Sequence, residues 1–432
     1  MATPQIDSER LARSIEELSR VGAFLDEHTG LHGVNRLALT DADRDGRDLV
    51  RSWFEKAGLS VRVDRIGNTF GRRAGKRSDL APVMAGSHID SVPTGGAFDG
   101  VLGVLGALEV VRTLNDHEVA TERPIEIAFF TDEEGARFGT DMLGSAVACG
   151  RISLVEALSK RDASGVSVGE ALSRIGYCGT ASERLDPPHA YLEAHIEQGP
   201  ILALEGWDLG VVTGVQGISW QEVNVSGKAA HAGTTPMSLR RDAGLAVSKL
   251  NVHLHDMVRS GRYGAEFRAT MGRMDPYPNK VNIVPGRVTA TIDLRNPDDE
   301  LMAQAERDLA GFLRAIEAEL GVQISARQTA RTPRISFSGM IQDRIAESMT
   351  ARGFSFRRIL SGAGHDAQEL SAICPTAMIF VPGEYEGISH NPREYSTPTA
   401  CGRGIQVLAD VLLSLSGEES GDVSGDVSGD VE

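Results

Sequence analysis

The sequence has 432 residues, of which 41% are hydrophobic and 24% charged, and its formal net charge at pH 7 is −16. This balance is that of an ordinary globular chain of about two or three domains, which excludes a collagen-like, fibrous or fully disordered protein. The excess of acidic residues would repel nucleic acid, and no apolar run is long enough for a transmembrane helix.

Two further features bear on the location of the protein. The segment from Met1 to Arg20 is polar and charged, so it lacks the apolar core of a secretory signal. The four cysteines, none in CxxC spacing, are Cys149, Cys178, Cys374 and Cys401. We therefore expect a cytoplasmic protein without a disulfide framework or a thiolate zinc site.

The N-terminal part of the chain alternates helix and strand patterns. Apolar residues at helical spacing predict three helices, over residues 7–27, 41–57 and 101–114. Apolar runs and alternation predict three strands, over residues 61–66, 82–87 and 125–131. This order predicts an α/β layer with a largely parallel sheet, in which functional residues gather beyond the carboxyl ends of strands.

A second unit is predicted within the first, over residues 213–330. Its strand, helix, strand, strand, helix and strand patterns cover 220–225, 238–258, 266–272, 286–294, 298–320 and 322–326. This is the order of a ferredoxin-like α+β fold. Residues 1–212 and 331–416 then form the other domain. The end, 417–432, repeats Ser-Gly-Asp-Val without apolar bulk and is expected to be a disordered acidic tail.

Residues able to bind a divalent metal lie at predicted strand ends and in turns. His88 follows one strand, and Asp90 would lie on the same face and support its ring. Asp99 lies in a glycine-rich turn, and its two oxygens could bridge two cations. Glu133 and Glu134 follow another strand and point in different directions, so that one could bind metal while the other handles a proton.

Two histidines in loop-like segments complete the set. His195 lies in Glu193–Pro200, and His390 lies in Gly387–Pro392. Each of these residues alone is more often an ordinary solvated or hydrogen-bonded side chain. Their ordered occurrence at strand ends indicates instead a metal site, and imidazole with carboxylate suits zinc, manganese, cobalt or nickel.

Together these motifs resemble the M20 metallopeptidase superfamily, and within it the hydantoinase/carbamoylase amidohydrolases. That group includes N-carbamoyl-L-amino-acid hydrolase, β-ureidopropionase and allantoate amidohydrolase. The matching segments are 86–92, 98–100, 131–138, 193–200, 231–237 and 389–394. The resemblance implies a two-domain α/β fold of the M20 type. It would pair a mixed-sheet, dinuclear-metal catalytic domain with an inserted ferredoxin-like lid that also dimerises.

The resemblance implies two divalent ions per subunit, zinc first, with manganese, cobalt or nickel as alternatives. His88 and His195 would bind one ion, Glu134 and His390 the other, and Asp99 both. The role of general base, which activates a water shared by the ions, would belong to Glu133.

Further residues would bind the substrate. His231 resembles the family's donor to the developing oxyanion, which in relatives comes from the second subunit of a homodimer. Asn282 and Arg295 would bind the substrate, with Arg295 offering a planar fork to its carboxylate. Gln198 and Gly364 would line the pocket, whereas His365 is not expected to be a ligand.

The predicted function is hydrolysis of the carbamoyl C–N bond of N-carbamoyl-L-amino acids to the amino acid, CO2 and ammonia. Allantoate and ureidopropionate remain alternative substrates. Allantoate enzymes tend to have Gln-Arg after the glycine that here is Gly217, and the less polar Ile218-Ser219 favours an apolar substrate side chain. His195 speaks against an aminoacylase or dipeptidase. A non-catalytic binding protein would be expected to have lost Glu133 or a ligand.

Overall fold

The structure, a computed structural model, describes residues 3–418. These residues fold into two compact units. The split unit combines the chain up to Gly214 with the chain from Ser336 onward, and the inserted unit is Val215–Ile335. Among the helices of the described part, none is long and apolar enough to cross a membrane.

The split unit is an α/β structure. Its helices are α1 (Ser8–Ser19), α2 (Asp41–Lys56), α3 (Val101–Asp116), α4 (Leu143–Cys149), α5 (Leu154–Ser159), α6 (Val168–Ile175), α7 (Ile201–Glu205), α10 (Gly339–Ala351), α11 (Asp366–Leu370) and α12 (Pro398–Ser416), with the short 3-10 helix η2 (Tyr385–Gly387). Its strands are β1 (Ala23–Leu25), β2 (His32–Val34), β3 (Ser60–Val63), β4 (Thr69–Arg73), β5 (Val83–His88), β6 (Ile125–Phe130), β7 (Ala190–Ile196), β8 (Leu209–Val215), β15 (Ile335–Ser336), β16 (Phe356–Ser361) and β17 (Thr376–Val381).

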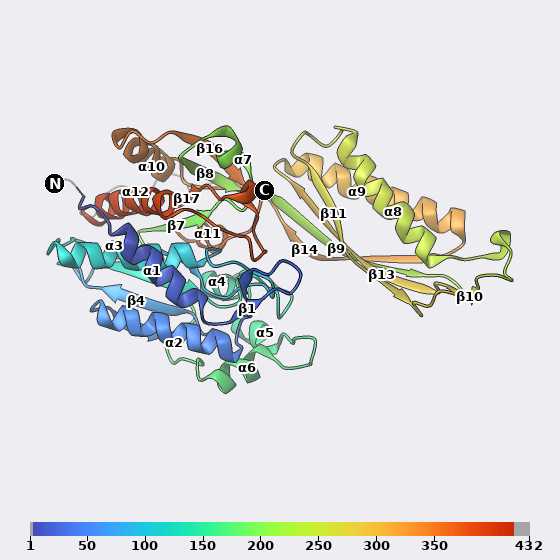
Figure 1. The fold of residues 1–432 in the computed structure, drawn as a ribbon, viewed down its shortest axis with the longest axis horizontal. Helices are drawn as coiled ribbons and strands as arrows, with labels where there is room; N and C mark the ends of the chain where they lie inside the picture. Colours follow the sequence, from blue (N-terminus) through green and yellow to red (C-terminus); the bar gives the residue numbers. More distant parts are fainter. Residues whose placement is uncertain (1–2, 419–432) are drawn as a thin grey trace. The chain divides into compact units, whose positions relative to one another are not determined.

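The main sheet is mixed, with the order β15-β8-β17-β7-β5-β6-β4-β3 and β16 paired to β8. The central strands β17, β7, β5 and β6 are parallel, and antiparallel pairs with β8 and β4 flank them. Helices α3 and α12 pack against each other and on the central strands, where β5 and β6 are buried throughout (Figure 1). The predicted M20-type α/β class is confirmed.

The inserted unit has the predicted order of elements. It contains β9 (Gly217–Ser226), β10 (Ala230–His231), η1 (Met237–Leu239), α8 (Ala243–Arg259), β11 (Arg268–Tyr277), β12 (Ile283–Val284), β13 (Arg287–Asn296), α9 (Asp299–Leu320) and β14 (Gln323–Thr332). The four long strands form one antiparallel sheet in the order β11-β13-β9-β14, the ferredoxin-like arrangement.

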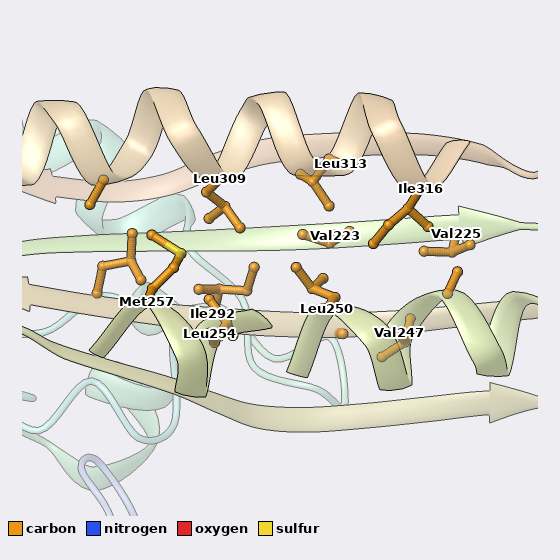
Figure 2. Packing of buried hydrophobic residues seen from close by; sticks show 14 of the residues in the cluster. Val223, Val225, Val247, Leu250, Leu254, Met257, Ile292, Leu309, Leu313 and Ile316 are labelled. Carbon is orange, nitrogen blue, oxygen red and sulfur yellow. The ribbon is translucent and has the colours of Figure 1, made fainter. Parts of the chain in front are cut away.

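The core of the inserted unit lies between its two long helices and the sheet. Leu254 of α8 and Leu309 of α9 lie near Ile292 of β13, and Leu250 and Leu313 lie near Val223 of β9 (Figure 2). The alternation of buried and half-buried residues along β13 matches a strand with one face on the core. Both helices start at an aspartate whose carboxylate accepts backbone N–H groups of the first turn.

Truncation of this core tests its contribution to stability. Leu309→Ala removes a side chain that is fully buried, so we expect the free energy of unfolding of the inserted unit to fall by about 2–5 kcal/mol. The matched control is Leu245→Ala on α8, where 40% of the side chain is exposed and the loss should stay near 0.5 kcal/mol. Urea unfolding of the full chain measures both, and equal losses would contradict this packing.

Several boundaries differ from those predicted. The first helix ends at Ser19 rather than near residue 27, because the chain turns at Gly22, with φ of 83°, into β1. Helix α8 starts at Ala243, not at 238, because Asp242 caps it. The last strand of the inserted unit continues to Thr332, which pairs with Ile218 of β9, so this unit extends past the predicted end at 330.

The predicted tail, 417–432, falls largely outside the described residues. Its first residues are held in place: the carboxylate of Glu418 lies 3.0 Å from Nε2 of His189 and 2.5 Å from Nη1 of Arg344. The guanidinium of Arg123 also donates to the backbone carbonyl of Glu418. Residues 419–432 are not described.

Candidate metal centre

Three neighbouring parallel strands bring the predicted site residues to one edge of the main sheet. Strand β5 ends at His88, which pairs in register with Phe130, the last residue of β6. Glu133 and Glu134 follow directly after β6, and His195 is the penultimate residue of β7. The carboxyl ends of parallel strands share an edge, so residues far apart in sequence meet there.

The carboxylate of Asp99 lies between two groups of candidate ligands. Its Oδ1 is 3.6 Å from Nε2 of His88 and 3.2 Å from Nε2 of His195. Its Oδ2 is 3.5 Å from Nε2 of His390, which in turn lies 3.2 Å from Oε2 of Glu134. In each group the ligand atoms all lie within 4.8 Å of one another. The structure thus brings together all five predicted ligands.

The two buried histidines present the same ring nitrogen to Asp99. Nδ1 of His88 lies 3.0 Å from the backbone carbonyl of Asp90, and Nδ1 of His195 lies 2.8 Å from that of Ile196. A carbonyl only accepts, so both rings carry the proton on Nδ1 and leave Nε2 as a ligand atom. The backbone of Asp90, rather than its carboxylate as predicted, is the acceptor at 3.0 Å; the carboxylate lies 3.8 Å away.

The geometry fits divalent cations. Oε1 of Glu134 is buried and has no hydrogen-bond partner among the described residues. Buried carboxylates are normally paired or bound to metal, because an isolated charge is costly to bury. Nitrogen and oxygen donors in this combination suit zinc and neighbouring transition metals.

The electrostatics of the site reflect its excess of carboxylates. Burial by itself would lower the pKa of His88, but Glu133, Asp99, Asp90 and Glu134 outweigh it and hold that pKa well above its ordinary value. The hydrogen bond to Glu134, against the opposing effect of burial, raises the pKa of His390 to about 9. The negative charge of the carboxylates therefore favours a bound cation at this site. Metal ions and the protons of the histidine rings compete for that place.

Glu133 belongs to none of the compact ligand groups but lies beside His88. Its Oε2 lies 3.4 Å from Nε2 of His88, and only 7% of the residue is exposed. Burial raises the pKa of the Glu133 carboxyl well above its usual range, and Asp366 and Glu134 raise it further against the opposing effect of His88. A carboxylate with a raised pKa is a stronger proton acceptor.

Backbone conformation at the site is unusual. Asp132, Gln198 and His390 have φ of 54°, 55° and 55°, in the left-handed region that side chains seldom adopt. Gly100, with φ of 66°, starts α3 beside His88, and a Cβ there would lie 2.4 Å from that ring. Only glycine therefore fits between Asp99 and the helix.

Further residues contact Asp99. Nε2 of Gln198 donates to Oδ2 of Asp99 at 2.7 Å, so Gln198 lies in the centre itself rather than only along a pocket wall. Ser389 also contacts Oδ2 of Asp99, and Glu394 accepts from the backbone N–H of Asp99. Sequence reasoning assigned no role to Ser389 or Glu394, although both lie in the segment that resembles the family.

The loop between β16 and α11 lies behind the centre. The ring of His365 is buried, and its centroid is 4.5 Å from that of His195. Its Nε2 lies 2.8 Å from Oγ of Ser361, and the ligand atoms of His365, His195 and Glu193 form a third compact group. Gly364 precedes His365, and a Cβ there would lie 3.2 Å from Cε of Met142.

The remaining predicted residues belong to the inserted unit. His231 is exposed on β10, and its Nδ1 accepts backbone N–H groups of Gly233 and Thr234. Asn282 is its neighbour, because Ala232 donates to the carbonyl of Asn282. Arg295 forms an ion pair with Asp293 at 2.9 Å near the other end of β13.

The two-unit fold and the clustered imidazole and carboxylate donors define a metal-dependent hydrolase of the M20 type. Residues 84–414 match the family described as Peptidase family M20/M25/M40. The chain belongs to this metal-dependent family, as the sequence predicted.

Individual relatives show which group within the family the chain resembles. The chain is 40% identical to an N-carbamoyl-L-amino-acid amidohydrolase of Rhizobium meliloti, over 96% of this chain and 98% of that protein. It is 38% identical to an N-carbamoyl-L-amino acid amidohydrolase of Geobacillus stearothermophilus, over 96% and 100%. A crystal structure of a hydantoinase/carbamoylase family amidase from Burkholderia vietnamiensis has a TM-score of 0.90 and 43% identity, covering 96% and 98%.

Other relatives carry the names of enzymes with other substrates. An allantoate amidohydrolase of Bacillus subtilis is 34% identical over 93% of this chain and 96% of that protein. A ureidoglycolate hydrolase of Arabidopsis thaliana is also 34% identical, over 95% and 87%. The predicted membership in the hydantoinase/carbamoylase group and the predicted enzyme class, hydrolysis of non-peptide C–N bonds, are confirmed.

Proposed function

We propose that this chain hydrolyses the carbamoyl C–N bond of N-carbamoyl-L-amino acids, releasing the amino acid, CO2 and ammonia. The observation that carries the proposal is the placement of Asp99 between two groups of ligands, with the separate carboxylate of Glu133 beside them. The names of the relatives from Rhizobium meliloti and Geobacillus stearothermophilus support the substrate class.

The metal centre in this proposal takes two divalent ions per subunit. His88, His195 and Asp99 would hold one ion, and Glu134, His390 and Asp99 would hold the other. Zinc is our first choice, with manganese, cobalt and nickel as alternatives, since all accept imidazole and carboxylate ligands.

Glu133 handles the proton in the proposed reaction. When bound, the two ions supply Lewis acidity, which makes a water acidic enough to lose its proton at neutral pH and polarises the ureido carbonyl. Glu133 accepts that proton and returns it to the leaving nitrogen. Burial of Glu133 keeps bulk water from competing for the proton.

His231 is the proposed donor to the oxyanion that develops on the ureido carbonyl. Its Nδ1 accepts two backbone N–H groups, so the ring proton is on Nε2, directed away from those contacts. A donor held in one tautomer is suited to a developing negative charge. Asn282, its neighbour, is a second proposed substrate-binding residue of the inserted unit, and Gln198 and Gly364 are those proposed in the split unit.

The spacing of these residues supports a homodimer. His231 of β10 pairs with Ile283 of β12, which comes just before β13 starts at Arg287, while Arg295 is eight residues further along β13. Figure 1 shows β10 at one end of the inserted unit. Eight residues of strand span roughly 27 Å. An N-carbamoyl amino acid is at most about 10 Å long. One substrate therefore cannot contact both residues of one chain, and the partner subunit supplies His231 and Asn282.

Arg295 is the proposed ligand of the substrate carboxylate. Arg295→Ala should raise KM for N-carbamoyl-methionine by about 10- to 100-fold, because a charge-assisted hydrogen-bond pair is lost. KM for the corresponding carboxamide should change much less, since that substrate carries no charge. Steady-state kinetics on both substrates measures this, and an equal effect on the two would contradict the assignment.

The neighbourhood of Arg295 favours an apolar substrate side chain. Ile218 of β9 pairs in register with Arg295, so it lies beside the proposed carboxylate site. A polar pair at 218–219, as expected for an allantoate enzyme, is absent from the sequence. Allantoate and ureidopropionate, which is N-carbamoyl-β-alanine, remain the alternative substrates on this scaffold.

The function is tested by a substrate panel on manganese- or zinc-loaded enzyme. Ammonia release should be fastest with N-carbamoyl-L-methionine and slower with allantoate, N-carbamoyl-β-alanine and the D-enantiomer. N-acetyl-methionine, assayed through methionine release, tests the aminoacylase alternative. Faster turnover of allantoate would make allantoate the substrate in place of N-carbamoyl-L-amino acids. Tight binding of these compounds without ammonia release would indicate a binding protein.

A further inference from the structure

Two loops from opposite ends of the sequence meet at the metal centre. One is the turn Gly95–Gly100, which carries Asp99, and the other is the segment Ser389–Glu394, which carries His390. The carboxylate of Glu394 joins them: its Oε1 accepts the backbone N–H of Phe98 at 2.9 Å and that of Asp99 at 3.0 Å. Glu394 therefore holds the backbone at Phe98 and Asp99 in place.

Glu394 also reaches the side chain of Asp99 through Ser389. Oγ of Ser389 lies 2.7 Å from Oε2 of Glu394 and 2.7 Å from Oδ2 of Asp99, and its single hydroxyl proton is shared between these two acceptors. Oδ2 is the oxygen that faces His390. The Glu394 carboxylate is thus connected to both the backbone and the side chain of Asp99.

Glu394 packs closely against the turn Gly95–Gly100. Only 5% of the residue is exposed. A Cβ on Gly96 would lie 2.3 Å from Cβ of Glu394, so only glycine leaves room for it. A second link between the two loops is the hydroxyl of Thr94, which donates to the backbone carbonyl of His390 at 3.3 Å.

We propose that Glu394 is a positioning residue that holds Asp99 and His390 in place for metal binding. Groups that orient metal ligands through hydrogen bonds are worth about 10- to 100-fold in metal affinity. The inference rests on the proposed metal centre but not on the proposed substrate. It gives Glu394 no contact with the substrate and no part in proton transfer.

The test is calorimetric titration of Mn²⁺ into the metal-free full chain. Glu394→Ala should weaken Mn²⁺ binding by about 10- to 100-fold relative to wild type. The matched control is Glu109→Ala, which removes another buried glutamate that accepts a backbone N–H, that of Asp7, but does not contact the centre. This control should bind Mn²⁺ as wild type does.

Two more variants keep the test independent of misfolding. Glu394→Gln retains an oxygen for the N–H groups and an amide that can donate to Ser389, so its affinity should stay within about threefold of wild type. Gly96→Ala should weaken binding by displacing Glu394. At saturating Mn²⁺, Glu394→Ala should lower kcat with little change in KM.

The outcomes separate the two proposals. Unchanged Mn²⁺ affinity in Glu394→Ala or Gly96→Ala would overturn the positioning role alone. Equal weakening in Glu109→Ala would also overturn it, since the effect would then be general destabilisation. If wild type bound no Mn²⁺ or Zn²⁺, the metal centre and this inference would both fail. Absence of ammonia release from a chain that binds metal would count only against the proposed substrate.

Discussion

Replacing Glu133 with glutamine should lower kcat by about 10²- to 10⁴-fold, which is the range for loss of a general base. Glutamine has nearly the same size but cannot accept the proton of the attacking water. The five proposed ligands are untouched, so the metal content after dialysis should equal that of wild type. Ammonia release and elemental analysis on the same preparation measure the two quantities.

The neighbouring residue provides the control for Glu133. Glu134→Gln removes a proposed ligand, so it should lose metal as well as activity. Glu133→Gln protein with full metal and wild-type turnover would refute the assignment of the base. Metal loss equal to that of Glu134→Gln would instead make Glu133 a ligand.

His231→Ala should lower kcat by about 10²- to 10³-fold, the usual cost of removing one donor to an oxyanion. Metal content should not change, because His231 lies in the inserted unit and is not among the proposed ligands. KM should change less than kcat, since the donor acts mainly on charge that develops in the transition state.

Mixed dimers provide the sharper test of His231. If each site combines Arg295 of one chain with His231 of the partner subunit, a dimer of His231→Ala and Arg295→Ala chains contains one intact site. At substrate concentrations well below KM, where both variants are impaired, random co-assembly of the two variants should then restore about a quarter of the wild-type kcat/KM. No recovery in verified mixed dimers would mean that both residues act from the same chain, or that one of them does not act.

Much of the candidate metal centre could be predicted because apolar runs in the sequence indicate where strands end. The apolar runs before His88 and Glu133 marked β5 and β6, and the parallel pairing of these strands brings the residues after them together. Asp99 in its glycine-rich turn and His390 in a loop had weaker local signals, and the family resemblance gave each its particular role. The ferredoxin-like order was predictable because its helices and strands have regular periodicity.

Other features depend on contacts that no local pattern encodes. Glu394 and Asp99 are separated by 295 residues, and their hydrogen bond exists only once β17 has placed the second loop beside the first. The separation of His231 from Arg295 follows from strand register, which the periodicity of one strand does not fix. The first helix was predicted to be too long, to residue 27 instead of Ser19, because apolar residues continue beyond its end into β1.

The antiparallel pairing of β9 with β14 has a consequence for how this chain assembles. Strand β9 begins the inserted unit and β14 ends it, and Ile218 is paired with Thr332. Closing an unstructured loop of this length would cost about 4 kcal/mol of entropy, most of which is saved once the insert has folded and joined its own ends. The hydrogen bond from the N–H of Phe337 to the carbonyl of Thr213 then connects neighbours instead of distant segments. A module that begins and ends at one point can be acquired, exchanged or removed during evolution while the host sheet keeps its strand order.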